Sequence, residues 1–418
     1  MRRFIPKQLL SFYHLAFAHF GALRWGYPSR KLFVIAVTGT KGKSSTSELI
    51  RAILTEAGYK VALASTIRFA IGEESEPNLF KMTMPGRGFL QRFLRRAVNE
   101  GATHAVIEMS SEGAKQFRHK GIELDALVFT NLAPEHLESH GSIEAYAAAK
   151  LSLAQHLAES PKRPRYIIAN ADDKYGQAFL ETPVEVRIPF FLKDAEPYTV
   201  DDTGVRFVYR GGSLFTAPLP GLFSLKNILA ALTLCDAMNI PRQTMQSAIQ
   251  HMLPIAGRAE RVERGQNFSV IVDYAHTPDS LRALFETYQH RRIIAVMGST
   301  GGGRDQWKRP EMGKIADELC HYIILANEDP YDEDPLDIVE AIAQGFTKHK
   351  PHIILNRRMA IREALREAKE GDVVLLTGKG TDPCICGPAG TREPWSDKRV
   401  AEEELDKLLH KDVKNALV

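Results

Sequence analysis

The sequence contains few cysteines and little net charge. Its 418 residues include four cysteines, too few for a disulfide-stabilised secreted scaffold and typical of a reducing cytosol. Cys384 and Cys386 stand two residues apart, but the sequence offers no second ligand pair or nearby histidine to complete a tetrahedral metal site. The formal net charge of +3 predicts no polyanionic partner such as nucleic acid. We therefore expect a cytoplasmic, monomeric protein with small-molecule partners.

The sequence also lacks a long uninterrupted apolar run. The segment from Leu9 to Leu23 is apolar, but it is too short to span a bilayer, and His14 and His19 interrupt it. No acidic residue precedes Glu48, whereas eight basic residues do: Arg2, Arg3, Lys7, Arg24, Arg30, Lys31, Lys41 and Lys43. Three interpretations stay open, namely a helix packed on the protein body, a basic helix on an anionic membrane, or a partner-docking helix. We favour packing on the body, because the apolar residues are spread around the helix and are too numerous to be left in water.

Strand-like apolar runs alternate with helical patterns through most of the chain, which predicts an α/β fold with mostly parallel sheets. The expected strands are 32–37, 61–65, 105–108, 126–129 and 166–169, then 270–273, 293–297, 322–326, 352–355 and 373–377. Short strands and turns at 184–217, and a helical pair after them, precede a Pro/Gly hinge at 253–258. We therefore expect a helical leader at 1–30, a central P-loop ATPase domain at 31–254 and a Rossmann-like doubly wound domain at 255–418.

A glycine-rich loop follows the first expected strand and opens a helix at about Ser44 to Ala57. Backbone amides in such a loop can approach phosphates, a lysine can reach the terminal phosphate oxygens, and the next hydroxyl can bind Mg²⁺. The sequence therefore predicts a nucleoside triphosphate, ATP, and Mg²⁺ at these residues: Gly39, Thr40, Lys41, Gly42, Lys43, Ser44 and Ser45.

Further polar residues follow other strands of the same expected sheet. Glu108 ends a strand, where a carboxylate can hold Mg²⁺ directly or through water, although alone it could equally be a surface acid. Thr130-Asn131, Glu135-His136 and Lys150, which lies four residues after Tyr146, are hard to explain together by packing alone.

These residues, with others downstream, resemble the Mur ligase family over about Leu32 to Leu409, and the loop also resembles the related folylpolyglutamate synthases. Within the family, the set is most similar to the members that add the third residue of the peptidoglycan stem peptide. The further matching segments are Asn170-Ala171-Asp172-Asp173, Gly221-Leu222-Phe223-Ser224 with Asn227, Gly257-Arg258-Ala259-Glu260, 273–280, 301–305 with 308–310, Gly378-Lys379-Gly380 and Trp395-Ser396-Asp397.

The resemblance implies an ATP-dependent acid–amino-acid ligase that forms an acyl phosphate and then an amide. It implies that the magnesium site is formed by Ser44, Glu108, His136 and a carbamylated Lys150. It further implies catalytic roles for Lys43, Lys150, His136 and Arg258, and contacts of Asn227 with adenine, Asp273 with ribose and Arg258 with phosphate. Acceptor and amino-acid contacts are implied for Thr83, Ser111, Asp329 and Asp382.

The chain departs from the family pattern in several places. The family's UDP-binding N-terminal domain is expected to be absent, and the apolar leader stands in its place. Glu112 replaces a common histidine, and Thr381-Asp382 replaces His-Glu. Glu328-Asp329-Pro330-Tyr331 replaces Asp-Asn-Pro-Arg, so the arginine that would grip a distal carboxylate of diaminopimelate is missing.

Three functions therefore compete. The first is a ligase that adds an amino acid to a muramoyl-peptide-like acceptor. The second is a ligase of the same superfamily that acts on another carboxylate, of folate or poly-amino-acid type. The third is a catalytically silent ATP-binding protein, which would have no reason to keep both halves of a split ATP site.

Overall fold

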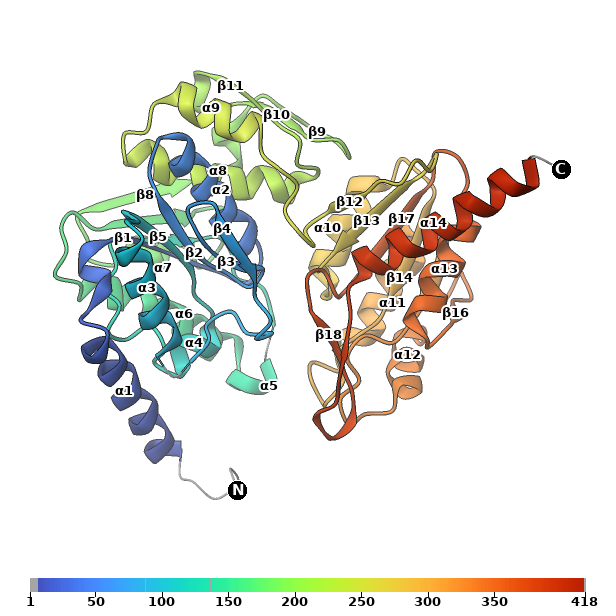
Figure 1. Cartoon of the computed structure of the whole chain (residues 1–418), viewed down its shortest axis with the longest axis horizontal. Coiled ribbons are helices and arrows are strands. Elements are labelled where there is room, and N and C mark those ends of the chain that lie inside the picture. Colours follow the sequence, from blue (N-terminus) through green and yellow to red (C-terminus); the bar gives the residue numbers. More distant parts are fainter. Residues whose placement is uncertain (1–6, 87, 136, 417–418) are drawn as a thin grey trace. The chain divides into compact units, whose positions relative to one another are not determined.

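The computed structural model describes residues 7–86, 88–135 and 137–416. The chain divides into two compact units. Unit 1 comprises Met1–Val200, Val205–Pro218 and Phe223–Met252, and unit 2 comprises Asp201–Gly204, Leu219–Leu222 and Leu253–Val418. Both units combine helices with mostly parallel sheets, so the predicted α/β class is confirmed (Figure 1).

Unit 1 is built on an eight-stranded sheet with the order β4-β3-β2-β5-β1-β6-β7-β8, in which only the β2–β3 and β3–β4 pairs are antiparallel. Its strands are β1 Phe33–Thr38, β2 Val61–Ala64, β3 Arg68–Ile71, β4 Glu74–Pro77, β5 His104–Glu108, β6 Ala126–Phe129, β7 Tyr166–Asn170 and β8 Val186–Phe190. Along β1, Val34 and Ala36 join the core on one face, while Ile35 and Val37 are equally buried on the other. Residues on both faces of the central strand are therefore covered, as a parallel sheet requires.

Helices and a small second sheet complete unit 1. The helices are α1 Lys7–Arg24, α2 Lys43–Glu56, α3 Phe89–Asn99, α4 Ser111–Lys115, α5 Leu137–His140, α6 Ile143–Ala158, α7 Gly176–Leu180, α8 Leu222–Ala237, whose first residue belongs to unit 2, and α9 Arg242–Gln250. Of the short strands expected at 184–217, β8 joins the large sheet in parallel with β7, whereas β9 Tyr198–Val200, β10 Val205–Val208 and β11 Leu214–Ala217 form a separate antiparallel sheet.

Unit 2 contains a six-stranded sheet with the order β12-β13-β17-β14-β15-β16, parallel except for the β12–β13 pair. Its strands are β12 Glu260–Val262, β13 Ser269–Asp273, β14 Ile293–Met297, β15 Tyr322–Leu325, β16 His352–Ile353 and β17 Val373–Thr377, with a separate hairpin of β18 Cys384–Cys386 and β19 Arg392–Pro394. Its helices are α10 Pro278–Tyr288, α11 Lys308–Leu319, α12 Pro335–Ala343, α13 Arg357–Glu367 and α14 Asp397–Ala416.

The leader forms a helix as expected, but the prediction that it packs on the body is wrong for most of its described side chains. Gly21 and Ala22 are buried at the C-terminal end of α1, whereas Tyr13, Phe17 and Phe20 are exposed. The number of apolar residues indicated a buried helix, yet among the described side chains of α1 only Gly21 and Ala22 are buried. None of the helices within the described residues is long and apolar enough to cross a membrane.

Candidate functional site

The glycine-rich loop connects β1 to α2 in unit 1. Gly39 and Gly42 have φ values of 148° and 81°, which side chains disfavour. A Cβ at Gly39 would clash with the Thr130 hydroxyl, and one at Gly42 would clash with the side chain of Asn227. Both positions therefore need glycine for the backbone conformation and for the close approach of a neighbour.

Residues that follow β6 hold the loop in shape. Thr40 N donates to Asn131 O over 2.8 Å, and Lys41 N donates to Asn131 Oδ1 over 2.9 Å. The Thr130 hydroxyl donates to Lys41 O over 2.7 Å. The polar pair Thr130-Asn131 thus acts as a brace for the loop, which gives a physical reason for its place at the end of a strand.

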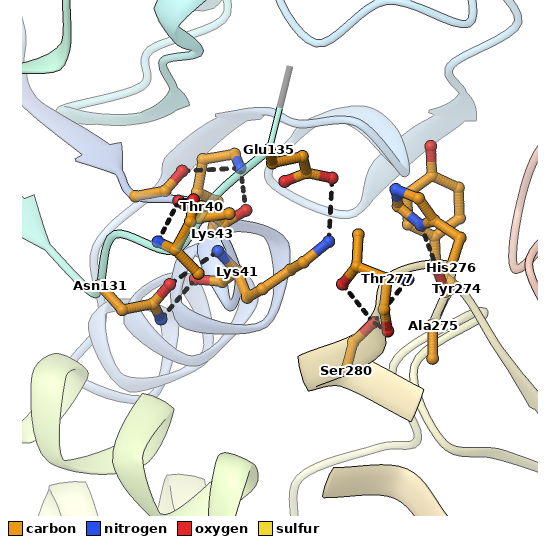
Figure 2. A network of polar contacts seen from close by, with 12 residues as sticks. Thr40, Lys41, Lys43, Asn131, Glu135, Tyr274, Ala275, His276, Thr277 and Ser280 are labelled. Atoms are coloured by element: carbon orange, nitrogen blue, oxygen red, sulfur yellow. Dashed lines mark hydrogen bonds and ion pairs between the residues drawn. The ribbon is translucent and has the colours of Figure 1, made fainter. Parts of the chain in front are cut away.

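Positive charge gathers at this loop, as Figure 2 shows. Lys43 Nζ donates to Gly39 O and Thr40 O over 3.0 and 2.9 Å, so its ammonium lies over the loop (Figure 2). Lys41 Nζ pairs with the buried Glu135 over 3.0 Å. Ser44 lies in the first turn of α2, whose amino-terminal amides add positive potential. The loop therefore offers the amide, ammonium and hydroxyl groups that bind phosphate.

Lys150 of α6 is brought to the same loop. Its side chain is 1% exposed, its Nζ donates to Gly39 O over 2.7 Å, and it lies 4.6 Å from the ring centroid of Tyr146. Burial lowers the pKa of Lys150 well below its usual value, and the positive charges of Lys43 and Lys41 lower it further, against an opposing effect of Glu135. Burial and the neighbouring lysines therefore disfavour the charged form of this amine.

Glu108 ends β5 beside the strand that leads into the loop, in register with Val37. It is fully buried, and its two carboxylate oxygens accept from Thr66 N and Thr66 Oγ1 over 3.0 and 2.9 Å. Thr66 also shares a hydrogen bond of 2.9 Å with Thr83, one of the predicted acceptor residues. The structure thus joins Glu108 to Thr83 through Thr66.

The structure describes two of the three remaining predicted residues of unit 1. Asn227, on α8, lies against Gly42 and accepts a hydrogen bond of 3.5 Å from the Thr46 hydroxyl. Ser111 is buried at the start of α4. His136 lies outside the described residues. The oxygen donors Ser44 and Glu108 suit Mg²⁺, which commonly takes one or two protein oxygens together with substrate phosphates and water.

In unit 2, Arg258 and Asp273 lie in one small cluster. The Arg258 guanidinium lies 4.5 Å from the ring centroid of Tyr274, and Asp273 accepts from Ala259 N and Ala275 N, each over 2.6 Å. The carboxylate of Asp273, at the end of β13, therefore joins the segment before β12 to the turn that follows β13.

A second cluster in unit 2 surrounds the fully buried Lys379. Its Nζ donates to Asp329 Oδ1 over 3.0 Å and lies 3.5 Å from Asp382, so the two predicted amino-acid contacts share one lysine. Glu328, beside them, accepts from the Thr300 hydroxyl over 2.9 Å. Burial, and then the charge of Asp329, raise the pKa of Glu328.

Several residues of these clusters were not predicted as site residues. Thr66 follows β2, Tyr146 shares a 3.2 Å hydrogen bond with Thr40, and Lys379 joins the two aspartates. The position of Thr66 just after a strand was an available signal. No sequence signal indicated that Tyr146 and Lys379 make these particular contacts. In the described part of the chain, no group of three or more His, Cys, Asp or Glu side chains could by itself hold a metal.

Comparison with known proteins gives matches over most of the chain. The family model "Mur ligase middle domain" matches residues 37–235, and "Mur ligase, glutamate ligase domain" matches residues 257–380. A UDP-N-acetylmuramoyl-L-alanyl-D-glutamate–2,6-diaminopimelate ligase of Caldanaerobacter subterraneus is 36% identical and covers 84% of this chain and 74% of its own length. A UDP-N-acetylmuramyl-tripeptide synthetase of Roseiflexus sp. is 35% identical, and the alignment covers 94% of this chain and 82% of the synthetase.

Among solved structures, a folylpolyglutamate synthase of Mycobacterium tuberculosis complexed with ADP aligns with a TM-score of 0.70. The alignment covers 88% of this chain and 92% of the synthase, at 15% identity. At this identity, the similarity shows the shared fold alone.

Proposed function

Because this chain belongs to the Mur ligase family, we propose that it joins an amino acid to a muramoyl-peptide-like acceptor in an ATP-dependent step of peptidoglycan precursor synthesis. The observation that carries the proposal is the loop Gly39–Ser45, which offers phosphate-binding amides and the Lys43 ammonium beside the strand that carries Glu108. In this reaction, ATP phosphorylates the acceptor carboxylate, the amine of the amino acid attacks the acyl phosphate, and the products are an amide, ADP and phosphate.

The residues of the loop supply electrostatic stabilisation. Lys43, whose ammonium lies against the loop, would neutralise charge that develops on the transferred phosphoryl group, in addition to the loop amides. Ser44 and Glu108 would hold Mg²⁺, with His136 added by resemblance. When bound, Mg²⁺ supplies neutralisation of phosphate charge.

Lys150 is proposed to be carbamylated. Its burial and its contact with Gly39 O place it at the loop, and a free ammonium there would add a third positive charge beside Lys41 and Lys43. A neutral amine can react with CO₂, which forms an N–C bond, releases one proton and leaves a carboxylate-like group. That group is compatible with a nearby cation, whereas an ammonium is not.

The residues of unit 2 are proposed to bind the rest of the substrates. Asp273 would accept a hydrogen bond from the ribose, and Arg258 would contact phosphate. Asn227, in unit 1, would contact adenine. Asp382 and Asp329 would meet the ammonium group of the incoming amino acid, with Lys379 keeping the pair in place.

Thr83 and Ser111 are proposed to contact the acceptor. The hydrogen bond from Thr83 to Thr66, and from Thr66 to Glu108, links the proposed acceptor contact to the proposed metal contact. The second candidate is a ligase that acts on another carboxylate acceptor, and the similarity in fold to a folylpolyglutamate synthase favours keeping it. A silent binding protein is the third and weakest candidate, because a scaffold needs no buried lysine against its phosphate loop.

The test is a matrix of acceptors and amino acids, read by ADP release and by the mass of the product. The acceptors are a UDP-muramoyl dipeptide, a muramoyl dipeptide without UDP, and a folate. We expect ADP release that requires both an amino acid and a muramoyl acceptor, and a product heavier by one aminoacyl residue. A product formed only from the folate would establish the second candidate. ATP binding without any product across the matrix would favour the third.

A further inference from the structure

Helix α1 carries a stripe of exposed aromatic side chains. Tyr13, Phe17 and Phe20 are spaced i, i+4, i+7 and so share one face of the helix, which Arg24 continues at i+11. The three aromatic side chains are 48%, 44% and 62% exposed. Exposed clusters of large apolar side chains usually mark an interaction surface.

The helix meets the body of unit 1 through other residues, near its C-terminal end. A Cβ at Gly21 would lie 3.3 Å from the backbone of Gly88, and one at Gly121 would lie within 2.7 Å of Ala22. Ala22 is fully buried, and α1 extends from this end away from the unit (Figure 1). The small residues therefore dock the helix, and the aromatic stripe is left for a different occupant.

Basic residues lie at the C-terminal end of α1, where the stripe ends. No acidic residue precedes Glu48 in the sequence. Arg24 lies 5.7 Å from the ring centroid of Trp25, and Arg95 of α3 donates to Trp25 O over 2.7 Å. Arg92, on the same helix, is exposed. An occupant of this surface therefore has to tolerate or favour positive charge.

A second exposed apolar element lies on the same unit. Leu79, Phe80 and Met82 are exposed in the loop that follows β4. The ring of Phe80 packs on Phe89 at 4.9 Å, and Phe89 directly follows Gly88, against which α1 docks. The helix and the loop are therefore connected through the first turn of α3.

We propose that the stripe of α1 and the loop around Phe80, together called the α1 surface, bind an anionic lipid surface. Aromatic and leucine side chains enter the headgroup region, while arginines and lysines are attracted to anionic headgroups. Two separate apolar elements, one of which ends beside basic residues, suit a lipid interface, which accommodates both without a matched shape. The helix would lie on the membrane, since it is not long and apolar enough to cross it.

The experiment is co-sedimentation of the full chain with phosphatidylcholine vesicles, with or without phosphatidylglycerol. We expect binding to the anionic vesicles that weakens when salt is raised from about 0.1 M to about 1 M, because the Debye length falls from ~10 Å to ~3 Å. The variant Phe17→Ser/Phe20→Ser should bind about tenfold more weakly or worse, since a single buried phenyl ring is worth about that factor.

The matched control is Leu214→Ser/Leu336→Ser, which removes two exposed leucines outside the α1 surface and should bind like the unmodified chain. Circular dichroism of both variants shows whether each is folded. Absence of binding to anionic vesicles, or equal binding by both variants, would overturn the proposal. So would self-association that depends on Phe17 and Phe20 without any vesicle binding, because the occupant would then be a second copy of the chain.

Discussion

Replacing Lys150 by alanine should nearly abolish ligation while the protein stays folded. The proposed carbamate carries a negative charge at a position where Lys150 Nζ now donates to Gly39 O over 2.7 Å, in the phosphate loop. Loss of one unit charge about 4 Å from a cation, at an effective dielectric constant of about 20, costs about 4 kcal/mol. This energy corresponds to a rate that is about a thousandfold lower.

The assay is amino-acid-dependent ADP release, measured with and without a short carboxylate such as acetate. Acetate should restore part of the activity of Lys150→Ala, because it can occupy the space that the side chain leaves and supply the missing negative charge. The Lys150→Met variant fills that space with apolar atoms and should not be rescued.

Lys174→Ala is the matched control, because Lys174 also lies over a tyrosine ring, at 4.8 Å from Tyr175, but is exposed. It should keep full activity and show no response to acetate. Near-normal activity of Lys150→Ala would refute the reasoning. So would failure of isotope-labelled bicarbonate to label Lys150 in the active, nucleotide-bound protein.

Three further predictions concern other parts of the chain. Lys43→Ala should lower ADP formation by about a hundredfold or more with an unchanged circular dichroism spectrum, because it removes charge neutralisation in phosphoryl transfer; near-normal turnover would contradict this. Asp382→Asn should raise the KM for the amino acid about tenfold with little change in the KM for ATP, as steady-state kinetics would show, whereas equal effects on both would argue against an amine contact. Burial lowers the pKa of His104 to about 4 from 6.5, so the folded state favours the neutral ring and loses stability as the pH falls from 6.5 to 4. His104→Phe should remove roughly 3 kcal/mol of that loss, measured by urea unfolding at several pH values, and an unchanged pH dependence would count against this cause.

Local sequence predicted the glycine-rich turn between a strand and a helix, and several strands around it. The glycines of the loop allow its backbone conformation, and Lys43 bonds to carbonyls of the same loop. Because these contacts are local, the spacing of the residues was enough to predict the turn. Glu108 ends its strand as predicted, and β5 lies directly beside β1, whereas its contact with Mg²⁺ stays a prediction. The strands Ala126–Phe129, Ile293–Met297 and Val373–Thr377 have the predicted bounds.

Contacts that depend on distant packing could not be predicted in the same way. Asn227 meets Gly42 only because α8 packs beside the loop, and the contact of Tyr146 with Thr40 depends on where α6 lies. The environment of α1 was wrongly predicted for a related reason. The number of apolar residues in a helix does not reveal which face meets the body, and among the described side chains of α1 it is Gly21 and Ala22 that are buried.

The proposal that ATP activates a carboxylate of the acceptor can be tested by following the oxygen atoms. The acceptor is prepared with heavy oxygen in the reacting carboxylate, and the phosphate and the amide are analysed by mass spectrometry after turnover. An acyl phosphate requires that one labelled oxygen leaves with the phosphate and that the other stays in the amide. We predict this distribution. Unlabelled phosphate alongside normal ADP release would contradict the account.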